Sequence, residues 1–159
     1  MALVAALPGP TFAQLAAPNA SGTAIGHIHI NASDVDAQSR FWASLRGKIV
    51  QREKITMAQF PGIYILLRKQ DSTGGSVGST INHFGFYVKD FDAEVARWKA
   101  AGLKWEPVTN PSVGQGFLTG PDSVRVEIYE DKSISTPMQM QAVPRWAAFT
   151  VNCALKVAM

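Results

Sequence analysis

Apolar and polar positions along the chain follow two different periods, and the change from one to the other marks two strand–helix pairs. The β-rich apolar runs Ile25 to Ala32 and Ile81 to Val88 are bounded by turn residues and predict strands. After the second run, Phe91, Val95 and Trp98 recur at i, i+4 and i+7, which predicts an amphipathic helix. The matching apolar stripe after the first run comprises Val35, Trp42 and Leu45.

The ends of both helices are marked by residues suited to those positions. Asp34 and Asp90 stand where a side-chain oxygen can accept from the free N–H groups of a first helical turn. Gly47 and Gly102 follow the two stripes, and glycine adopts the positive φ at which many helices stop. Each strand is therefore expected to lead directly into a short capped helix.

Short strand candidates follow each helix. In the first half they are Lys48 to Gln51, Ile55 to Phe60 and Gly62 to Arg68. In the second half they are Leu103 to Pro107, Gly116 to Thr119 and Ser123 to Glu130. The Ser-, Thr- and Gly-rich segment Asp71 to Thr80 reads as a linker between the halves.

The two halves are copies of one unit. Shifting the chain by 56 positions aligns the stretch from His27 to Trp42 with the stretch from His83 to Trp98, with five identities over sixteen positions. The identical pairs are His27/His83, Asp34/Asp90, Asp36/Asp92, Ala37/Ala93 and Trp42/Trp98. We therefore predict an α+β fold of two tandem βαβββ modules, residues 24–70 and 81–131, in a domain spanning residues 24–131.

Composition narrows the class of protein. The chain has 159 residues, 47% of them hydrophobic and 17% charged, which suits one globular domain with a real core. The net charge of +3 comes from scattered Lys and Arg with acids close by, so we expect no nucleic-acid partner. A single cysteine, Cys153, excludes an intramolecular disulfide and a CxxC motif. No apolar run reaches the roughly 18 residues of a membrane span, so no membrane association is expected.

Both ends of the chain differ from the domain. Residues 1–23 form an uncharged, Ala- and Pro-rich tail that fits either a disordered segment or the back part of a secretory signal with a cut after Ala13, leaving a cytoplasmic or exported location open. Residues 132–159 form a C-terminal tail of unclear role. From Arg145, alternating apolar positions predict one further strand.

The three histidines of the chain all stand at the openings of the repeated strands. Side chains alternate along a strand, so His27 and His29 share one face, and His83 holds the position related to His27 by the repeat. If the modules pack as near-symmetry mates, His27 and His83 face each other across a cavity. Two neutral imidazoles beside an acid suit a metal ion. A pair of hydrogen-bonded core histidines is the alternative.

Glu127 is the candidate acid. It stands among apolar neighbours in the run from Val124 to Tyr129. A buried carboxylate needs a partner, because its desolvation otherwise costs several kcal/mol. A metal ion would supply one, and an Arg or Lys partner or a solvated edge position is the alternative. We therefore predict a divalent-metal site made of His27, His83 and Glu127.

Three stretches together resemble the vicinal oxygen chelate superfamily, which includes glyoxalase I, fosfomycin-resistance transferases, bleomycin-resistance proteins and extradiol dioxygenases. They are His27 to Asp34, His83 to Asp90 and Gly120 to Tyr129. The resemblance implies paired βαβββ modules that form a cupped mixed sheet around a metal, with His27, His83 and Glu127 at ligand positions. It also implies that modules can pair between chains.

One departure from glyoxalase I matters. Members like glyoxalase I take a fourth ligand, Glu or Gln, from the last strand of the first module, and here Ile63 to Leu67 offers none. Two histidines and one carboxylate with open positions are typical of non-heme iron oxygenases and equally of catalytic zinc or manganese sites. The metal (Fe, Mn, Zn or Ni) is therefore left open, and weak or absent glyoxalase I activity is expected.

Around this site His29, Tyr87, Arg125 and Tyr129 are candidates for substrate binding. Arg125 suits a carboxylate or phosphonate, and the tyrosines suit a substrate oxygen. The alternatives are a rim position in water or beside an acid for Arg125, packing in the cavity wall for the tyrosines, and a core histidine for His29. The sequence thus favours a metal-dependent lyase, isomerase, transferase or dioxygenase acting on a small oxygen-rich substrate, in a homodimer. The alternative is a metal-free sequestering protein of the bleomycin-resistance kind.

Overall fold

The computed structural model describes residues 19–108 and 114–134 of the chain. The first module contains β1 (His27–Ala32), α1 (Val35–Ser44), β2 (Lys48–Arg52), β3 (Ile55–Phe60) and β4 (Ile63–Lys69). The second contains β5 (Phe84–Val88), α2 (Phe91–Ala100), β6 (Lys104–Pro107), β7 (Gln115–Thr119), the 3-10 turn η2 (Pro121–Ser123) and β8 (Arg125–Glu130). The repeated βαβββ order is therefore confirmed, whereas the signal-like segment near Ala13 and the strand predicted from Arg145 lie outside the described residues.

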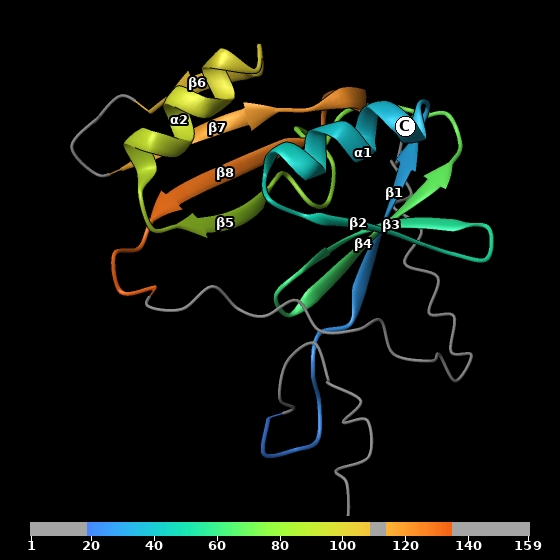
Figure 1. The fold of residues 1–159 in the computed structure, drawn as a ribbon. Coiled ribbons are helices and arrows are strands. Elements are labelled where there is room, and N and C mark those ends of the chain that lie inside the picture. The colour runs from blue at the N-terminus through green and yellow to red at the C-terminus, as the bar shows by residue number, and fades with distance from the viewer. Residues whose placement is uncertain (1–18, 109–113, 135–159) are drawn as a thin grey trace, which may run out of the picture.

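Each module folds into its own four-stranded mixed sheet. The strand orders are β1-β4-β3-β2 and β5-β8-β7-β6, and in each sheet the first strand runs parallel to the last strand of its module while the other pairs are antiparallel. Both helices lie on the same side of the sheets (Figure 1). The α+β class predicted from the sequence is confirmed.

The helix starts follow the predicted capping. The side chain of Asp34 accepts a hydrogen bond from the backbone N–H of Ala37 at 2.9 Å, and Asp90 accepts from Ala93 at 3.1 Å. These bonds satisfy donors that the first turn leaves free. The repeat thus preserves the way each helix begins.

The helix ends follow the prediction only in the second module. Gly102 has φ 74°, as expected, but after α1 the positive φ of 70° belongs to Arg46. Gly47 is needed there for space, because a Cβ at that position would lie 2.6 Å from the Phe60 ring and 2.9 Å from the Trp42 carbonyl oxygen. The expectation that Gly47 supplies the left-handed residue is wrong. Glycine is required at position 47 because the chain after α1 packs closely against Phe60 and Trp42.

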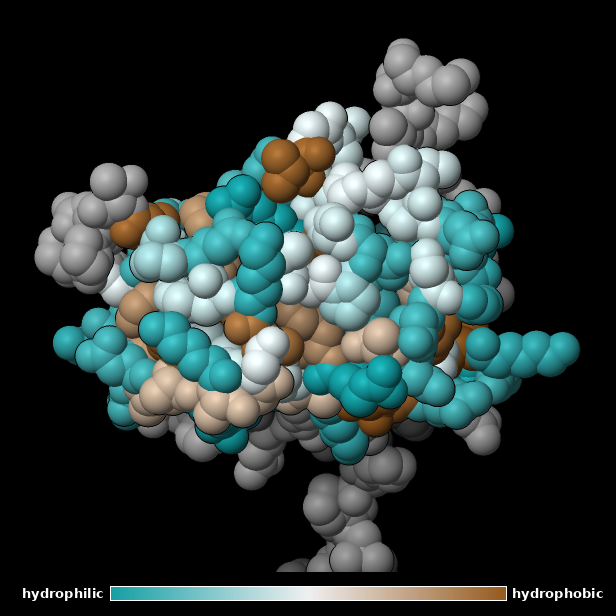
Figure 2. Space-filling model, turned by 90° about the horizontal axis from the view of Figure 1, so that it is seen from above, coloured by the Kyte–Doolittle hydropathy of each residue, from teal (hydrophilic) through white to brown (hydrophobic). Residues whose placement is uncertain are grey.

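One hydrophobic core joins the modules. Buried side chains from both modules form a single cluster that includes Phe41 and Trp42 of α1, Trp98 of α2 and Val126 and Ile128 of β8. Seen from above in Figure 2, the outer surface on the helix side is mostly hydrophilic or neutral, and its apolar residues are scattered. The apolar faces of the helices are therefore turned inward, and no helix in the described ranges is long and apolar enough to span a membrane.

A fully buried glutamine fastens α1 to the second module. The amide nitrogen of Gln38 donates to the Pro121 carbonyl oxygen at 2.9 Å and to Asp122 at 3.1 Å, and its amide oxygen accepts from the Trp42 indole at 2.9 Å. The carboxylate of Asp122 also accepts from the backbone N–H of Ser33. These bonds fix the position of η2 against α1.

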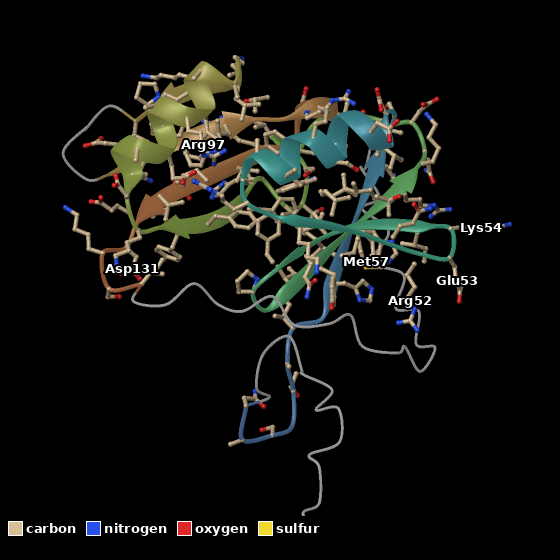
Figure 3. The ribbon with its side chains drawn as sticks, in the orientation of Figure 1. Arg52, Glu53, Lys54, Met57, Arg97 and Asp131 are labelled. Carbon is tan, nitrogen blue, oxygen red and sulfur yellow. The ribbon has the colours of Figure 1, made fainter. Side chains whose placement is uncertain are left out.

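A second set of polar contacts joins the two helices. Arg97 reaches from α2 toward α1 (Figure 3), where its guanidinium donates to the Ser44 carbonyl oxygen at 2.5 Å. Glu94 pairs with Arg97 and also with Arg46, at 2.7 Å in the latter case. Burial acts to raise the pKa of Glu94, but hydrogen bonds and charges from these two arginines outweigh it and hold that pKa below its ordinary value.

Candidate functional site

The pleat of each sheet separates the core from the predicted site residues. Val126 and Ile128 of β8 enter the shared core, so Arg125, Glu127 and Tyr129 lie on the opposite face of the sheet. In β1, Ile28 and Ile30 pack with the core in the same way. His27 and His29 therefore also lie on a face turned away from that core. We call these two surfaces the open faces of the modules, and on that of the first module Met57, Tyr64 and Leu66 form a small buried cluster of their own.

The strand register shows which residues share the open face of the second module. Glu127 of β8 is paired with Gly85 of β5 and Phe117 of β7. One step further along the sheet, Tyr129 is paired with Tyr87 and Gln115. His83 stands immediately before β5 rather than inside the predicted strand, and its side chain remains 36% exposed.

His83 and Glu127 are brought into direct contact. The Nε2 atom of His83 lies 2.9 Å from Oε2 of Glu127, whose residue is 9% exposed. The Nδ1 atom of His83 lies 3.0 Å from Oδ1 of Asn82. An amide oxygen and a carboxylate oxygen both only accept, and a neutral imidazole carries a single N–H. With that hydrogen on Nδ1 for Asn82, the contact between Nε2 and Glu127 needs a second proton or a metal ion between the two atoms.

The pair fits a metal ion. Two ligands at about 2.1 Å from the ion lie roughly 3.4 Å apart on a tetrahedral zinc, and roughly 3.0 Å apart where they meet at a right angle on a six-coordinate ion. The observed 2.9 Å separation of Nε2 and Oε2 is close to the value for a six-coordinate ion, and it is also the length of a direct hydrogen bond between the two groups. A fixed Nδ1–H beside a carbonyl is also how metal-binding histidines are commonly oriented.

His27 belongs to a different cluster. Its ring lies edge-on to that of His29, with centroids 5.1 Å apart, on the open face of the first module. No group of three His, Cys, Asp or Glu side chains within residues 19–108 and 114–134 is placed to hold a metal. One copy of the chain thus brings together two of the three predicted ligands, and the three-ligand site stays a prediction.

The remaining predicted substrate residues differ in their surroundings. Burial, then the charges of His27 and Arg68, lowers the pKa of His29. Tyr87 is 66% exposed, and its ring packs against that of Tyr129 with centroids 5.8 Å apart. Burial, followed by the hydrogen bond and charge of Glu127, raises the pKa of the Tyr129 hydroxyl.

Arg125 is stacked rather than free in water. Its guanidinium lies 3.9 Å from the centroid of the Phe117 ring, and Phe117 in turn meets the His83 ring edge-on at 5.7 Å. The Nη2 atom of Arg125 is 3.7 Å from Glu106, while its buried Nε has no hydrogen-bond partner. The Phe117 ring therefore lies between the Arg125 guanidinium, whose Nε–H is unpaired, and the ring of His83.

Sequence reasoning missed Asn82, Gln115 and Phe117. Phe117 and Gln115 face Glu127 and Tyr129 across the β7–β8 pair, and both follow from the antiparallel register set by the turn at Gly120 to Ser123. Gln115 was left outside the predicted strand, which began at Gly116, and the observed strand begins one residue earlier. Counting outward from that turn would have placed Gln115 opposite Tyr129 and Phe117 opposite Glu127.

The comparisons with known proteins agree with this architecture. A possible glyoxalase from Bacillus cereus superposes with a TM-score of 0.55 at 18% identity, covering 66% of this chain and 96% of that one. Lactoylglutathione lyase from Agrobacterium tumefaciens superposes with a TM-score of 0.51 at 20% identity, covering 72% of this chain and 98% of that one. Fosfomycin resistance protein FosX from Listeria monocytogenes superposes with a TM-score of 0.53 at 18% identity, covering 69% of this chain and 90% of that one. No protein-family model matches the sequence, and the curated proteins give no significant sequence match.

The chain therefore has the fold of the vicinal oxygen chelate superfamily, as the resemblance implied. At these identities the likeness establishes the fold and leaves the reaction to be argued from the site.

Proposed function

We propose that this protein is a metal-dependent enzyme that acts on a small oxygen-rich substrate bound to a divalent ion. The observation that carries the proposal is the contact between Nε2 of His83 and Oε2 of Glu127 at 2.9 Å, with Nδ1 of His83 held by Asn82. An imidazole nitrogen and a carboxylate oxygen this close together are a ligand pair for Fe, Mn, Zn or Ni. When bound, the metal would act as a Lewis acid and orient the substrate oxygens.

We propose further that His27 of a second copy completes the site in a homodimer. His27 lies on the open face of the first module and His83 with Glu127 on that of the second, and both faces are turned away from the core that joins the modules. Packing the first-module face of one copy over the second-module face of another brings the three ligands together. Two-fold dimers are the commonest closed assembly, and the exchange repeats itself symmetrically.

Other side chains near the metal ligands then contact different parts of the substrate. Arg125, stacked on Phe117, offers its unused Nε–H to an anionic part of the substrate such as a carboxylate or phosphonate. The exposed ring of Tyr87 provides a flat surface beside the metal ligands. His29 enters from the first-module face beside His27, where its imidazole offers a nitrogen that can accept a proton.

The test measures two quantities, the metal content of the purified protein and its molecular mass in solution. Protein purified without oxygen should carry close to one divalent ion per chain, and His83→Ala and His27→Ala should each abolish it. His29→Ala is the matched control, because it makes the same change on the same face as His27 and should retain the ion. Light scattering at micromolar concentration should give a dimer.

Three outcomes contradict the proposal. Full metal in His83→Ala would overturn the ligand assignment. A monomer mass with full metal would overturn the shared site, and wild-type protein without metal would favour a metal-free binding protein.

A further inference from the structure

A polar side chain outside the predicted site holds one oxygen of Glu127. The amide nitrogen of Gln115 donates to Oε1 of Glu127 at 2.6 Å and to the Tyr129 hydroxyl at 2.6 Å. The Tyr129 hydroxyl in turn donates to the same Oε1 at 3.1 Å. These three groups form a closed ring of hydrogen bonds around one carboxylate oxygen.

The donor chemistry fixes the orientation of each group. An ionised carboxylate only accepts, so Gln115 must present its NH₂ group rather than its oxygen to Glu127. One amide hydrogen then serves Oε1 and the other serves the tyrosine oxygen, which leaves the phenolic hydrogen for Oε1. Oε1 thus accepts two hydrogen bonds, whereas the partner of Oε2 among the described residues is Nε2 of His83.

We propose that Gln115 is the positioning residue of the candidate metal centre, and that it makes Glu127 bind through Oε2 alone. This inference rests on the proposed function. With both lone pairs of Oε1 engaged, the carboxylate presents a single donor atom on the side of His83. A one-oxygen ligand leaves one more coordination position open for a chelating substrate than a two-oxygen ligand does.

The alternative role for Gln115 is purely structural. Glu127 is only 9% exposed, and a buried carboxylate needs donors whether or not a metal is present. A structural role predicts a loss of stability on substitution and no specific change at a bound ion. The coordination of the ion therefore separates the two roles, and stability does not.

The experiment uses chelator-treated full-length protein and adds Co²⁺ and Mn²⁺. Gln115→Met keeps the length of the side chain and removes both donors, and Tyr129→Phe removes the second donor to Oε1 in case the first variant fails to fold. Gln51→Met is the matched control, because it makes the same change at an exposed position on β2. Calorimetry gives the metal affinity, and the visible spectrum of bound Co²⁺ reports its coordination.

We expect Gln115→Met to weaken metal binding roughly 10- to 100-fold, the usual effect of removing a group that orients a ligand. Its Co²⁺ spectrum should shift because both oxygens of Glu127 become available, and Tyr129→Phe should shift it in the same direction. Metal affinity and spectrum equal to those of wild type in both variants would overturn the role of Gln115 while leaving the metal site intact. A wild-type protein that binds neither ion would overturn the proposed function and the positioning role together.

Discussion

Gln38 offers a direct measurement of how strongly the two modules are joined. Its side chain is fully buried and makes all three of its hydrogen bonds inside the protein, two of them to η2 of the second module. In Gln38→Met the volume is nearly kept and every one of these bonds is lost. The substitution therefore tests polar contacts without opening a large cavity.

The expected cost follows from what each partner retains. The Trp42 indole N–H is buried and loses its acceptor, which costs about 1–3 kcal/mol. The Pro121 carbonyl still accepts from Val124, and Asp122 still accepts from Ser33, so each of these losses is about 0.5–1 kcal/mol. Greater apolar burial of Met offsets roughly 1 kcal/mol. We expect a net loss of about 1–4 kcal/mol, or about 2–16 °C in Tm for a chain of this size.

Urea unfolding followed by tryptophan fluorescence measures the change. Gln51→Met, the same substitution at an exposed site whose only described side-chain hydrogen bond is a long one of 3.5 Å to Glu53, is the control and should stay within about 0.5 kcal/mol of wild type. Gln38→Glu should be at least as damaging as Gln38→Met near pH 7, because its carboxylate faces the acceptors Pro121 and Asp122. If Gln38→Met matches the control, this glutamine does not join the modules.

Two further predictions concern the helix contact and the reaction. Glu94→Gln should cost about 1 kcal/mol at pH 7, a value kept small because the side chain of Arg46 is 69% exposed. Because the folded pKa of Glu94 lies below its ordinary 4.5, its contribution is present above that pH and is lost as pH falls through the folded pKa, so unfolding curves of wild type and variant should converge in acid. Turnover of the methylglyoxal–glutathione adduct should be weak or absent, since β4 supplies no acid on the open face, and robust turnover in a spectrophotometric assay would contradict the site as described.

Much of the fold was predictable because the repeat carries local information twice. The Asp caps at 34 and 90, the helical stripes and the order of the strands all follow from spacings within a few residues. The strand containing Glu127 was also located correctly. These features depend on backbone periodicity and on short-range hydrogen bonds, which the sequence states directly.

The parts that could not be predicted depend on contacts between distant residues. Gln38 reads as an ordinary polar position on a helix, and only the approach of η2 shows why it is buried. The relative placement of the modules decides whether His27 meets His83, and the sequence contains no local signal for that choice. The contact of Nε2 of His83 with Glu127 needed only the register of one sheet, so the sequence came closer to it.

The separation of the core from the open faces has a consequence for how such a protein can change over time. Residues on the two faces of one strand are subject to different demands, since Val126 and Ile128 must fill a fixed volume while Arg125 and Tyr129 lie on the open face. Substitutions on the open face can therefore alter what is recognised at little cost to folding. A scaffold of this kind can acquire new substrates by point mutation of alternate strand positions, with the duplicated core inherited unchanged.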